Sequence, residues 1–281
     1  MAGLLLNACG NFILKNLKNV SNRKIIGSGK ANFHITAKYF QEKCPDDKVY
    51  TTRLALPPDY ENVTEFMLES YYKYEPVVIN IGIQGTEPTE IWRTMMYSQV
   101  KAGLSIIAED RDNCVIGAAL NYVTSIHEGK EMYNLARCCA TGPHRDIVEF
   151  FGYIAETPKL WERYCVHSIF EQASVAVSQD FQGLGIARRL IQESWVLARD
   201  CGYRLFRLDC NSSYCARIAT GFGWPLVWSI PFSQYVRNGE VVFKHVKEPH
   251  TVCRVYVDYL RYCKTYCPPY KGCQTLTPPP F

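Results

Sequence analysis

Apolar and polar residues alternate along several short stretches of the chain, and this pattern predicts β-strands. Residues 49–56 (VYTTRLAL) and residues 167–178 (HSIFEQASVAVS) both alternate in this way. Successive side chains of a strand point to opposite faces, so the alternation indicates strands with one face in a core. A strand pair is expected at 105–110 and 114–123, around a turn at 111–113, and further strands at 204–210, 225–232 and 253–260.

Apolar residues that recur every three or four positions predict amphipathic helices between these strands. One helix is expected to begin at Tyr60, because the prolines at 57 and 58 stop the first strand and Asp59 is a good N-cap residue. The resulting order is β, α, α, several strands, then β-α-β-α-β-β, which predicts a mixed α+β sheet rather than a doubly wound parallel one. The other helices are expected over 87–103, 145–165 and 185–200 and from about Ser212.

The composition is that of a globular protein with a large core, since 47% of its 281 residues are apolar. A net charge of +4 is too small to indicate a nucleic-acid binder, and no apolar run reaches the ~18 residues of a membrane span. The chain has 13 cysteines and no convincing signal peptide, so we expect most of them to be reduced, buried and intracellular. Cys263, Cys267 and Cys273 lack zinc-site spacing, and no metal is expected.

The chain is expected to divide into three parts. Residues 1–46 form a basic extension, residues 47–260 the folded domain, and residues 261–281 a tail rich in cysteine and proline. The first 41 residues contain six lysines or arginines and no acid, which resembles a mitochondrial presequence. Only one of the six is an arginine, so we favour a disordered extension and a cytoplasmic protein, with the mitochondrion as the alternative.

A glycine-rich loop stands between a predicted strand and a predicted helix, in residues 179–190 (QDFQGLGIARRL). The start of a helix offers unpaired N–H groups and a positive dipole end, and glycines let a ligand approach the backbone closely. These properties suit a phosphate or pyrophosphate, and a tight turn without a ligand is the alternative. A dinucleotide fingerprint would need glycine at Arg188, and a Walker loop would need Lys-Ser/Thr after Gly185.

The strand, the loop and the helix together resemble the acetyl-CoA signature of the GNAT superfamily of N-acetyltransferases, Gln/Arg-x-x-Gly-x-Gly/Ala. Gln182, Gly185 and Ala187 stand at its three specified positions. The resemblance implies an α+β GNAT fold, with a central mixed, mostly antiparallel sheet flanked by helices and splayed at the acetyl-CoA strand. It also implies acetyl-CoA as co-substrate, bound by Val175, Val177, Gln182, Gly183, Leu184, Gly185, Ile186, Ala187 and Arg188. An ordinary place on the helix surface is the alternative for Arg188.

Two further segments resemble insect-type arylalkylamine N-acetyltransferases. Residues 71–77 (YYKYEPV) place the catalytic glutamate of that subfamily at Glu75, which is expected to act as a general base through a water. Its alternative is an exposed carboxylate at a helix end.

Residues 210–224 (CNSSYCARIATGFGW) match the second segment, with departures at the acid positions. The two catalytic serines of the subfamily fall on Asn211 and Cys215, and the tyrosine acid of the wider family falls on Ala219. Cys215 is the expected proton donor to the leaving thiolate, and Ser212 and Tyr214 are its possible substitutes. Packing is the alternative for Cys215, and helix capping is the alternative for Ser212.

The resemblance implies an acetyl-CoA-dependent N-acetyltransferase that acts on a small primary amine. The implied acceptor is an arylalkylamine such as dopamine, serotonin, tyramine or octopamine. One alternative is a non-catalytic acyl-CoA-binding protein of the same fold, suggested by the missing serines and tyrosine. Another is an acyltransferase with a different donor or acceptor, for example glycine or a polyamine. No nucleic-acid partner is expected.

Overall fold

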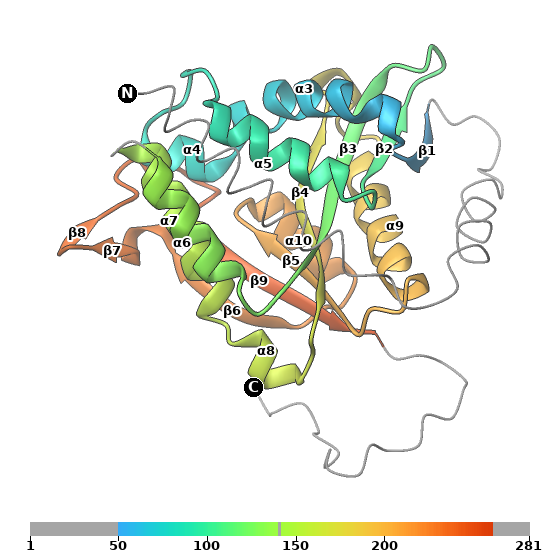
Figure 1. Cartoon of the computed structure of the whole chain (residues 1–281). Helices are drawn as coiled ribbons and strands as arrows, with labels where there is room; N and C mark the ends of the chain where they lie inside the picture. Colours follow the sequence, from blue (N-terminus) through green and yellow to red (C-terminus); the bar gives the residue numbers. More distant parts are fainter. Residues whose placement is uncertain (1–49, 140–141, 261–281) are drawn as a thin grey trace, which may run out of the picture.

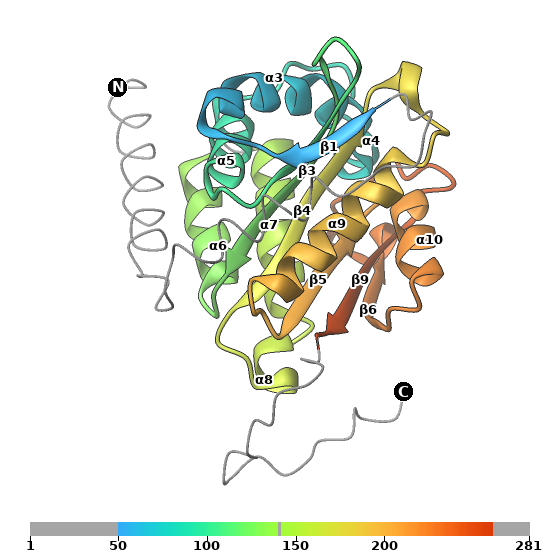
Figure 2. The ribbon, with the colours of Figure 1, turned by 90° about the vertical axis from the view of Figure 1, so that its right-hand side faces the viewer.

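The computed structural model describes residues 50–139 and 142–260, which form a central sheet between two layers of helices (Figures 1 and 2). In these residues the sheet has seven strands in the order β1-β2-β3-β4-β5-β9-β6, and β7 and β8 form a separate ribbon. Every predicted strand is present. The strands are β1 Thr51–Leu54, β2 Ile106–Glu109, β3 Val115–Thr124, β4 Ile169–Val177, β5 Leu205–Cys210, β6 Leu226–Pro231, β7 Val236–Arg237, β8 Glu240–Val241 and β9 Val252–Tyr259.

Each face of the sheet is covered by helices (Figures 1 and 2). The predicted helices are present, except that the one expected over 145–165 divides into α7 and α8, and the structure adds α4 and α6, which the sequence pattern did not indicate. One face carries α3 Tyr60–Ser70, α4 Pro76–Ile81, α5 Glu90–Lys101, α6 Glu128–Cys138 and α7 Pro143–Glu156, and the other carries α9 Ile186–Asp200 and α10 Ser213–Gly221. The short α8 Leu160–Tyr164 connects α7 to β4.

The alternation of side chains along the strands divides the apolar core in two. Ile107 and Leu120 belong to a buried cluster with α3, α5 and α7. Their neighbours Ile106 and Ala119 belong to a second cluster with α9 and α10. Central strands such as β2 and β3 are therefore buried on both faces, and not on the one face that the alternation indicated.

The sheet is antiparallel at every junction except β4–β5, which is parallel. These two strands pair only over Phe170–Gln172 of β4 and Phe206–Leu208 of β5. Beyond that point β4 runs on to Val177 beside β3, and β5 runs on to Cys210 beside β9. The sheet therefore opens between β4 and β5, which confirms the predicted splay.

Two local expectations were wrong. Helix α3 begins at Tyr60 as predicted, but the Asp59 side chain does not cap it. Asp59 ends a 3-10 turn over Pro57–Asp59, accepts a hydrogen bond from the Leu56 N–H at 2.7 Å and pairs with Arg53 at 2.6 Å. The cysteines are also less buried than expected. Of the eight cysteines in the described residues, only Cys210 and Cys253 are buried, whereas Cys114, Cys138, Cys165 and Cys201 are exposed.

Two predicted segments lie outside the described residues. These are the basic extension 1–46 and the tail 261–281 with Cys263, Cys267 and Cys273. Among the helices that the structure does describe, none is both long enough and apolar enough to cross a membrane.

Candidate functional site

The opening between β4 and β5 leaves part of the β4 backbone without a strand partner. The Ser178 N–H donates to the Ile116 carbonyl at 2.9 Å, so Ser178 is a residue whose backbone groups point toward β3. Alternate residues of β4 share this direction. The N–H and C=O groups of Val175 and Val177 therefore point away from β3 and into the opening. A β-bulge precedes them, because Leu120 pairs with Ser174 and Asn121 pairs with Gln172, so that Ala173 is left over. The structure thus places Val175 and Val177 where an extended ligand could bond to a free strand edge.

The glycine loop connects this strand edge to the start of α9. Gly183 and Gly185 have φ of +80° and +78°, the left-handed conformation that favours glycine. A Cβ atom at either position would meet no atom within 4 Å, so the loop borders open space. Within the described part of the chain, the N–H groups of Gly183, Leu184 and Gly185 donate no hydrogen bond, and those of the first turn of α9 have no helical acceptor. Together these groups form a cradle for an anion.

The other residues of the loop divide between exposed and packed positions. The side chains of Gln182 and Leu184 are exposed, whereas Ile186 is buried against Gly117 and packs in the core under α9. The Arg188 guanidinium lies 4.3 Å from the centroid of the Phe222 ring, at the end of α10. This cation–π contact ties α9 to α10, which is a structural use of the Arg188 side chain.

Glu75 lies at the turn between a 3-10 segment, Tyr72–Tyr74, and α4, and its side chain is only 5% exposed. The Asn211 amide donates to Glu75 Oε1 at 2.8 Å, and Tyr71 and the Val77 N–H also bond to the carboxylate. Burial raises the pKa of the Glu75 carboxyl above its ordinary value, and these hydrogen bonds oppose the rise. Because Glu75 is buried, its alternative as an exposed helix-end carboxylate is wrong.

The three candidates on α10 occupy different surroundings. Ser212 is the N-cap of α10, and its hydroxyl accepts a hydrogen bond from the Tyr214 N–H at 3.2 Å. Tyr214 is 55% exposed and makes an edge contact with His250. Neither of these two side chains lines the pocket described below.

Cys215 is half-buried and packs in the same core cluster as Val175 and Val177. Burial raises the pKa of the Cys210 thiol, and its hydrogen bond with Cys215 raises that pKa further. The pKa of Tyr71 is raised mainly by burial and next by the Glu75 carboxylate. The Cys215 thiol raises it by a smaller amount. Cys215 is therefore the α10 candidate whose thiol lies near Cys210 and near Tyr71, the residue that bonds to Glu75.

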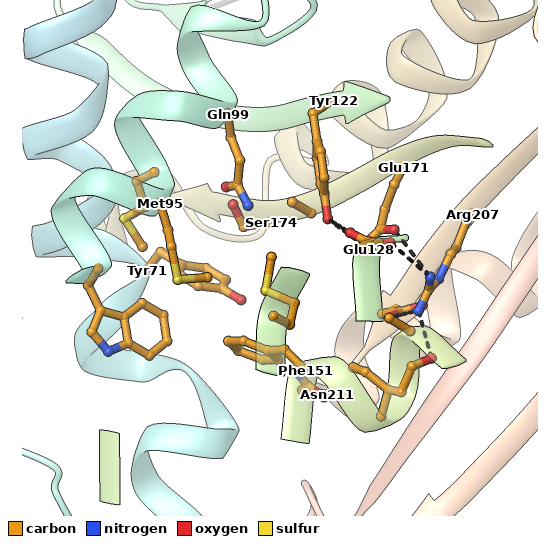
Figure 3. Close-up of a pocket in the computed structure, with 17 residues that line it drawn as sticks. Tyr71, Met95, Gln99, Tyr122, Glu128, Phe151, Glu171, Ser174, Arg207 and Asn211 are labelled. Carbon is orange, nitrogen blue, oxygen red and sulfur yellow. Dashed lines mark hydrogen bonds and ion pairs between the residues drawn. The ribbon is translucent and has the colours of Figure 1, made fainter. Parts of the chain in front are cut away.

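A pocket lies on the α5 and α7 side of the sheet, over the opening between β4 and β5 (Figure 3). Trp92, Met95 and Phe151 give it an apolar wall. Ser174 and Asn211 lie at the edge of the sheet opening, and Figure 3 shows Gln99 pointing toward Ser174. Glu75 is not part of the lining, and it contacts the pocket through the two lining residues that bond to it, Tyr71 and Asn211.

A buried group of charged residues closes the other end of the pocket (Figure 3). Arg207, only 1% exposed, bonds to Asp209 in a bidentate pair at 2.6 and 2.9 Å and to the Ile154 carbonyl at 2.9 Å. Its guanidinium also lies 3.3 Å from Glu171 and 3.6 Å from Glu128.

The Tyr122 hydroxyl joins these two glutamates, because it donates to Glu128 and its oxygen lies 3.3 Å from Glu171 Oε1. Burial raises the pKa of Glu128 to about 7 and the pKa of Glu171 well above its ordinary value. Both carboxyls therefore hold protons at pH values where an exposed glutamate would be ionised.

Sequence reasoning missed this charged group and the two partners of Glu75. The members of the charged group come from β3, β4, β5 and α6, which are far apart in the sequence. One signal was available, because Glu171 and Arg207 are charged residues within predicted central strands, and they stand opposite each other in the β4–β5 pairing. A charged residue in a buried strand must find a partner or a ligand.

The fold is shared by several solved N-acetyltransferase structures, although no protein-family model matches this chain. A polyamine N-acetyltransferase of Drosophila melanogaster that forms N-acetylagmatine is 23% identical, with a TM-score of 0.68 over 75% of this chain and 100% of that one. A mosquito arylalkylamine N-acetyltransferase-like protein 5b is 22% identical, with a TM-score of 0.70 over 75% and 100%. Arylalkylamine N-acetyltransferase 2 of Aedes aegypti is 22% identical, with a TM-score of 0.69 over 76% and 100%.

These structural neighbours are GNAT-fold N-acetyltransferases, and they include insect arylalkylamine N-acetyltransferases. Likeness at this level of identity establishes the fold of the present chain. It has the GNAT fold, as the glycine loop and its flanking strand and helix predicted. In this chain the anion cradle lies at the start of α9 and the free edge of β4 lies in the sheet opening. The pocket lies on the α5 and α7 side of that opening.

Proposed function

We propose that the protein is an acetyl-CoA-dependent N-acetyltransferase that transfers an acetyl group to a small primary amine. One observation carries the proposal. The opening between β4 and β5 has an anion cradle at one side and, at the other, a pocket backed by a buried carboxylate. A donor and an acceptor that enter from the two sides would meet at the β4 bulge.

The residues of the opening fit acetyl-CoA along its length. The N–H groups of residues 183–187 would hold the pyrophosphate at the start of α9. The unpaired backbone groups of Val175 and Val177 would bond to the amides of the pantetheine arm, as a neighbouring strand would. The acetyl group would then lie at the bulge around Ala173 and Ser174, with a backbone N–H of β4 polarising its carbonyl.

The transfer requires one proton to leave the amine and one to reach the sulfur of CoA. Glu75 would accept the first proton, through a water held beside Asn211 and Tyr71, and its raised pKa makes it a better base than an exposed glutamate. The amine nitrogen forms a bond to the acetyl carbon as the carbon–sulfur bond breaks. Cys215 is our candidate donor of the proton that the leaving thiolate takes up.

The acceptor that we propose in the first place is an arylalkylamine. The wall of Trp92, Met95 and Phe151 supports this choice, because aromatic and thioether side chains pack well against a flat ring. Two of the neighbouring structures are named for the same class of acceptor, and another is named for polyamines.

We also propose that this activity resides in residues 47–260 and that the protein acts in the cytoplasm. The mitochondrion is the alternative location, because the first 41 residues are basic and lack acids. Fusing these residues to a fluorescent reporter tests it, and import of the reporter into mitochondria would overturn the cytoplasmic assignment.

The test of the proposed function is turnover with acetyl-CoA and a panel of tryptamine, serotonin, tyramine, dopamine and octopamine. The acetylated product should be detected by mass spectrometry, because the exposed cysteines of the protein react with thiol reagents. We expect N-acetyl products in amounts that rise with enzyme and with time. Binding of acetyl-CoA without transfer to any amine would instead support a non-catalytic acyl-CoA-binding protein.

A further inference from the structure

The charged end of the pocket has more acidic than basic groups. The bidentate pair with Asp209 and the bond to the Ile154 carbonyl use Nε and Nη2 of Arg207, so that Nη1 alone faces the two glutamates. Glu128 and Glu171 are thus left without a full counter-charge, although each is less than one-tenth exposed. Buried carboxylates are normally paired, because an ionised group loses its hydration when it is buried.

Unpartnered polar atoms in the pocket point to a ligand at this end. Oε2 of Glu128 and Oε2 of Glu171 are buried and make no hydrogen bond, although both lie within ion-pair distance of Arg207. The Ser174 hydroxyl, at the sheet opening, is also buried without a partner, and the Ser174 residue is 8% exposed. The pocket therefore has unsatisfied polar groups at both of its ends, with an apolar wall between them (Figure 3).

The distance between the two ends suits a short linear molecule. Glu171 and Ser174 are three residues apart on β4, which spans about 10 Å in an extended strand and less across the bulge at Ala173. Both side chains line the same pocket. An alkyl chain with a nitrogen at each end could place one nitrogen near Ser174 and the other near the two glutamates.

We propose that Glu128 and Glu171 form a binding site for a second cationic group of the acceptor, so that linear diamines and amino-guanidines are preferred over alkyl monoamines of the same chain length. This inference rests on the proposed function, and it names the substrate class of that same site. The second ammonium or guanidinium supplies the hydrogen-bond donors and the positive charge that the two glutamates lack. An arylalkylamine would instead bind through the apolar wall in the middle of the pocket.

The protonation of the two glutamates is consistent with this role. Burial raises both pKa values, so that without a ligand the pair retains protons near neutral pH. A cation beside them would favour the ionised forms and release those protons. Asp209 and Tyr122 face the same space, but Asp209 is paired with Arg207, and the one hydroxyl hydrogen of Tyr122 is already shared with the glutamates.

The first arm of the test compares matched substrates with the full-length wild-type protein at saturating acetyl-CoA. Putrescine and n-pentylamine form one pair, because a terminal methyl replaces the second ammonium. Agmatine and n-hexylamine form a second pair, with and without a guanidinium. We expect kcat/KM to be about 10- to 100-fold higher for the dication of each pair, mainly through a lower KM. A buried charge-assisted hydrogen bond typically strengthens binding by roughly this factor.

The second arm uses Glu171→Gln and Glu128→Gln, which keep shape and remove charge. In these variants the ratio of kcat/KM between putrescine and n-pentylamine should fall at least tenfold. Glu131→Gln is the matched control, because Glu131 is on the same helix as Glu128 but does not line the pocket. The control should keep the wild-type ratio. Circular dichroism confirms that each variant is folded.

The outcomes separate this inference from the proposed function. Turnover of monoamines at rates equal to those of diamines would overturn the second-cation site and leave the acetyltransferase intact. The second-cation site would also be overturned if kcat/KM were higher for octopamine and serotonin than for phenethylamine and tryptamine, with no preference for diamines. The glutamates would then accept hydrogen bonds from hydroxyl groups of the acceptor. No turnover of any amine, with acetyl-CoA bound, would overturn the proposed function itself.

Discussion

At Glu75, burial and hydrogen bonding act in opposite directions on one carboxylate. Burial raises its pKa, whereas the donors Tyr71, Asn211 and the Val77 N–H stabilise its charge. The net pKa stays above the ordinary value, which is what a general base near neutral pH needs. Asn211 stands where the resembled subfamily has a serine, and in this chain its amide orients the base.

Replacing Glu75 by Gln tests this role. We expect kcat to fall by about 10²–10⁴-fold, the usual loss for a general base, while acetyl-CoA affinity stays near that of the wild type. In the wild type, activity should fall as the pH is lowered through the raised pKa of Glu75, because only the ionised form accepts a proton. That acid limb should be missing from the variant. Glu69→Gln, an exposed change on α3, is the control, and a Glu75→Gln profile equal to it would refute the assignment.

Cys215 makes a second prediction at this scale. If its thiol faces the sulfur of CoA, a small alkylating reagent should inactivate the enzyme, and saturating acetyl-CoA should protect both the activity and this residue. Cys165, exposed beside α8, serves as an internal control that should react equally in both conditions. Cys215→Ser should keep much more activity than Cys215→Ala, because a hydroxyl can still donate. Mass spectrometry that finds Cys215 unreactive, or equally reactive with and without acetyl-CoA, would reduce it to a packing residue.

At the scale of elements, local periodicity predicted most of the fold, because strands and amphipathic helices repeat over a few residues. Helix α6 was missed, since residues 128–138 contain few apolar side chains and its inner face includes Glu128. The resemblance also predicted the opening of the sheet. The pocket could not be predicted, because its walls and its charged end join side chains from five or more elements.

Ser212 shows how an element can explain a residue that sequence reasoning considered catalytic. Its hydroxyl caps α10, so Ser212→Ala should lower the free energy of unfolding by about 0.5–2 kcal/mol. Ser212→Asn keeps a capping side chain and should retain most of that stability. Denaturant unfolding measures both variants. A large loss of kcat in Ser212→Ala, at unchanged stability, would contradict the capping role and return Ser212 to the chemistry.

At the scale of the whole molecule, the buried acids should make stability depend on pH. The pKa values of Glu128 and Glu171 are raised in the folded state, that of Glu128 to about 7, so the folded protein binds more protons than the unfolded chain from about pH 4.5 up to the raised pKa values. The stability from these protons is fully present below the unfolded pKa and is lost as the pH rises through the folded pKa.

The double variant Glu128→Gln/Glu171→Gln isolates this effect from other titrating groups, including His144 and His250, whose pKa values burial lowers. Relative to the wild type, its Tm should rise as the pH increases from 5.5 to 8.5, because its free energy of unfolding rises by up to about 1.4 kcal/mol per pH unit for each proton. Thermal melts over this range measure the difference. A difference in Tm that is independent of pH would show that neither glutamate holds a proton in the folded protein.

The central claim is that the glycine loop and the open edge of β4 hold acetyl-CoA. Calorimetric titration of acetyl-CoA into the wild type, Gly185→Glu and Gly185→Asn tests it most directly. Both variants strain the same left-handed position, which asparagine tolerates better than most residues, but only glutamate brings a negative charge to the anion cradle. We predict binding to the wild type, binding within about tenfold of it in Gly185→Asn, and none in folded Gly185→Glu, because its carboxylate would repel the pyrophosphate. Equal affinity of the two variants, or no binding to the wild type, would contradict the claim.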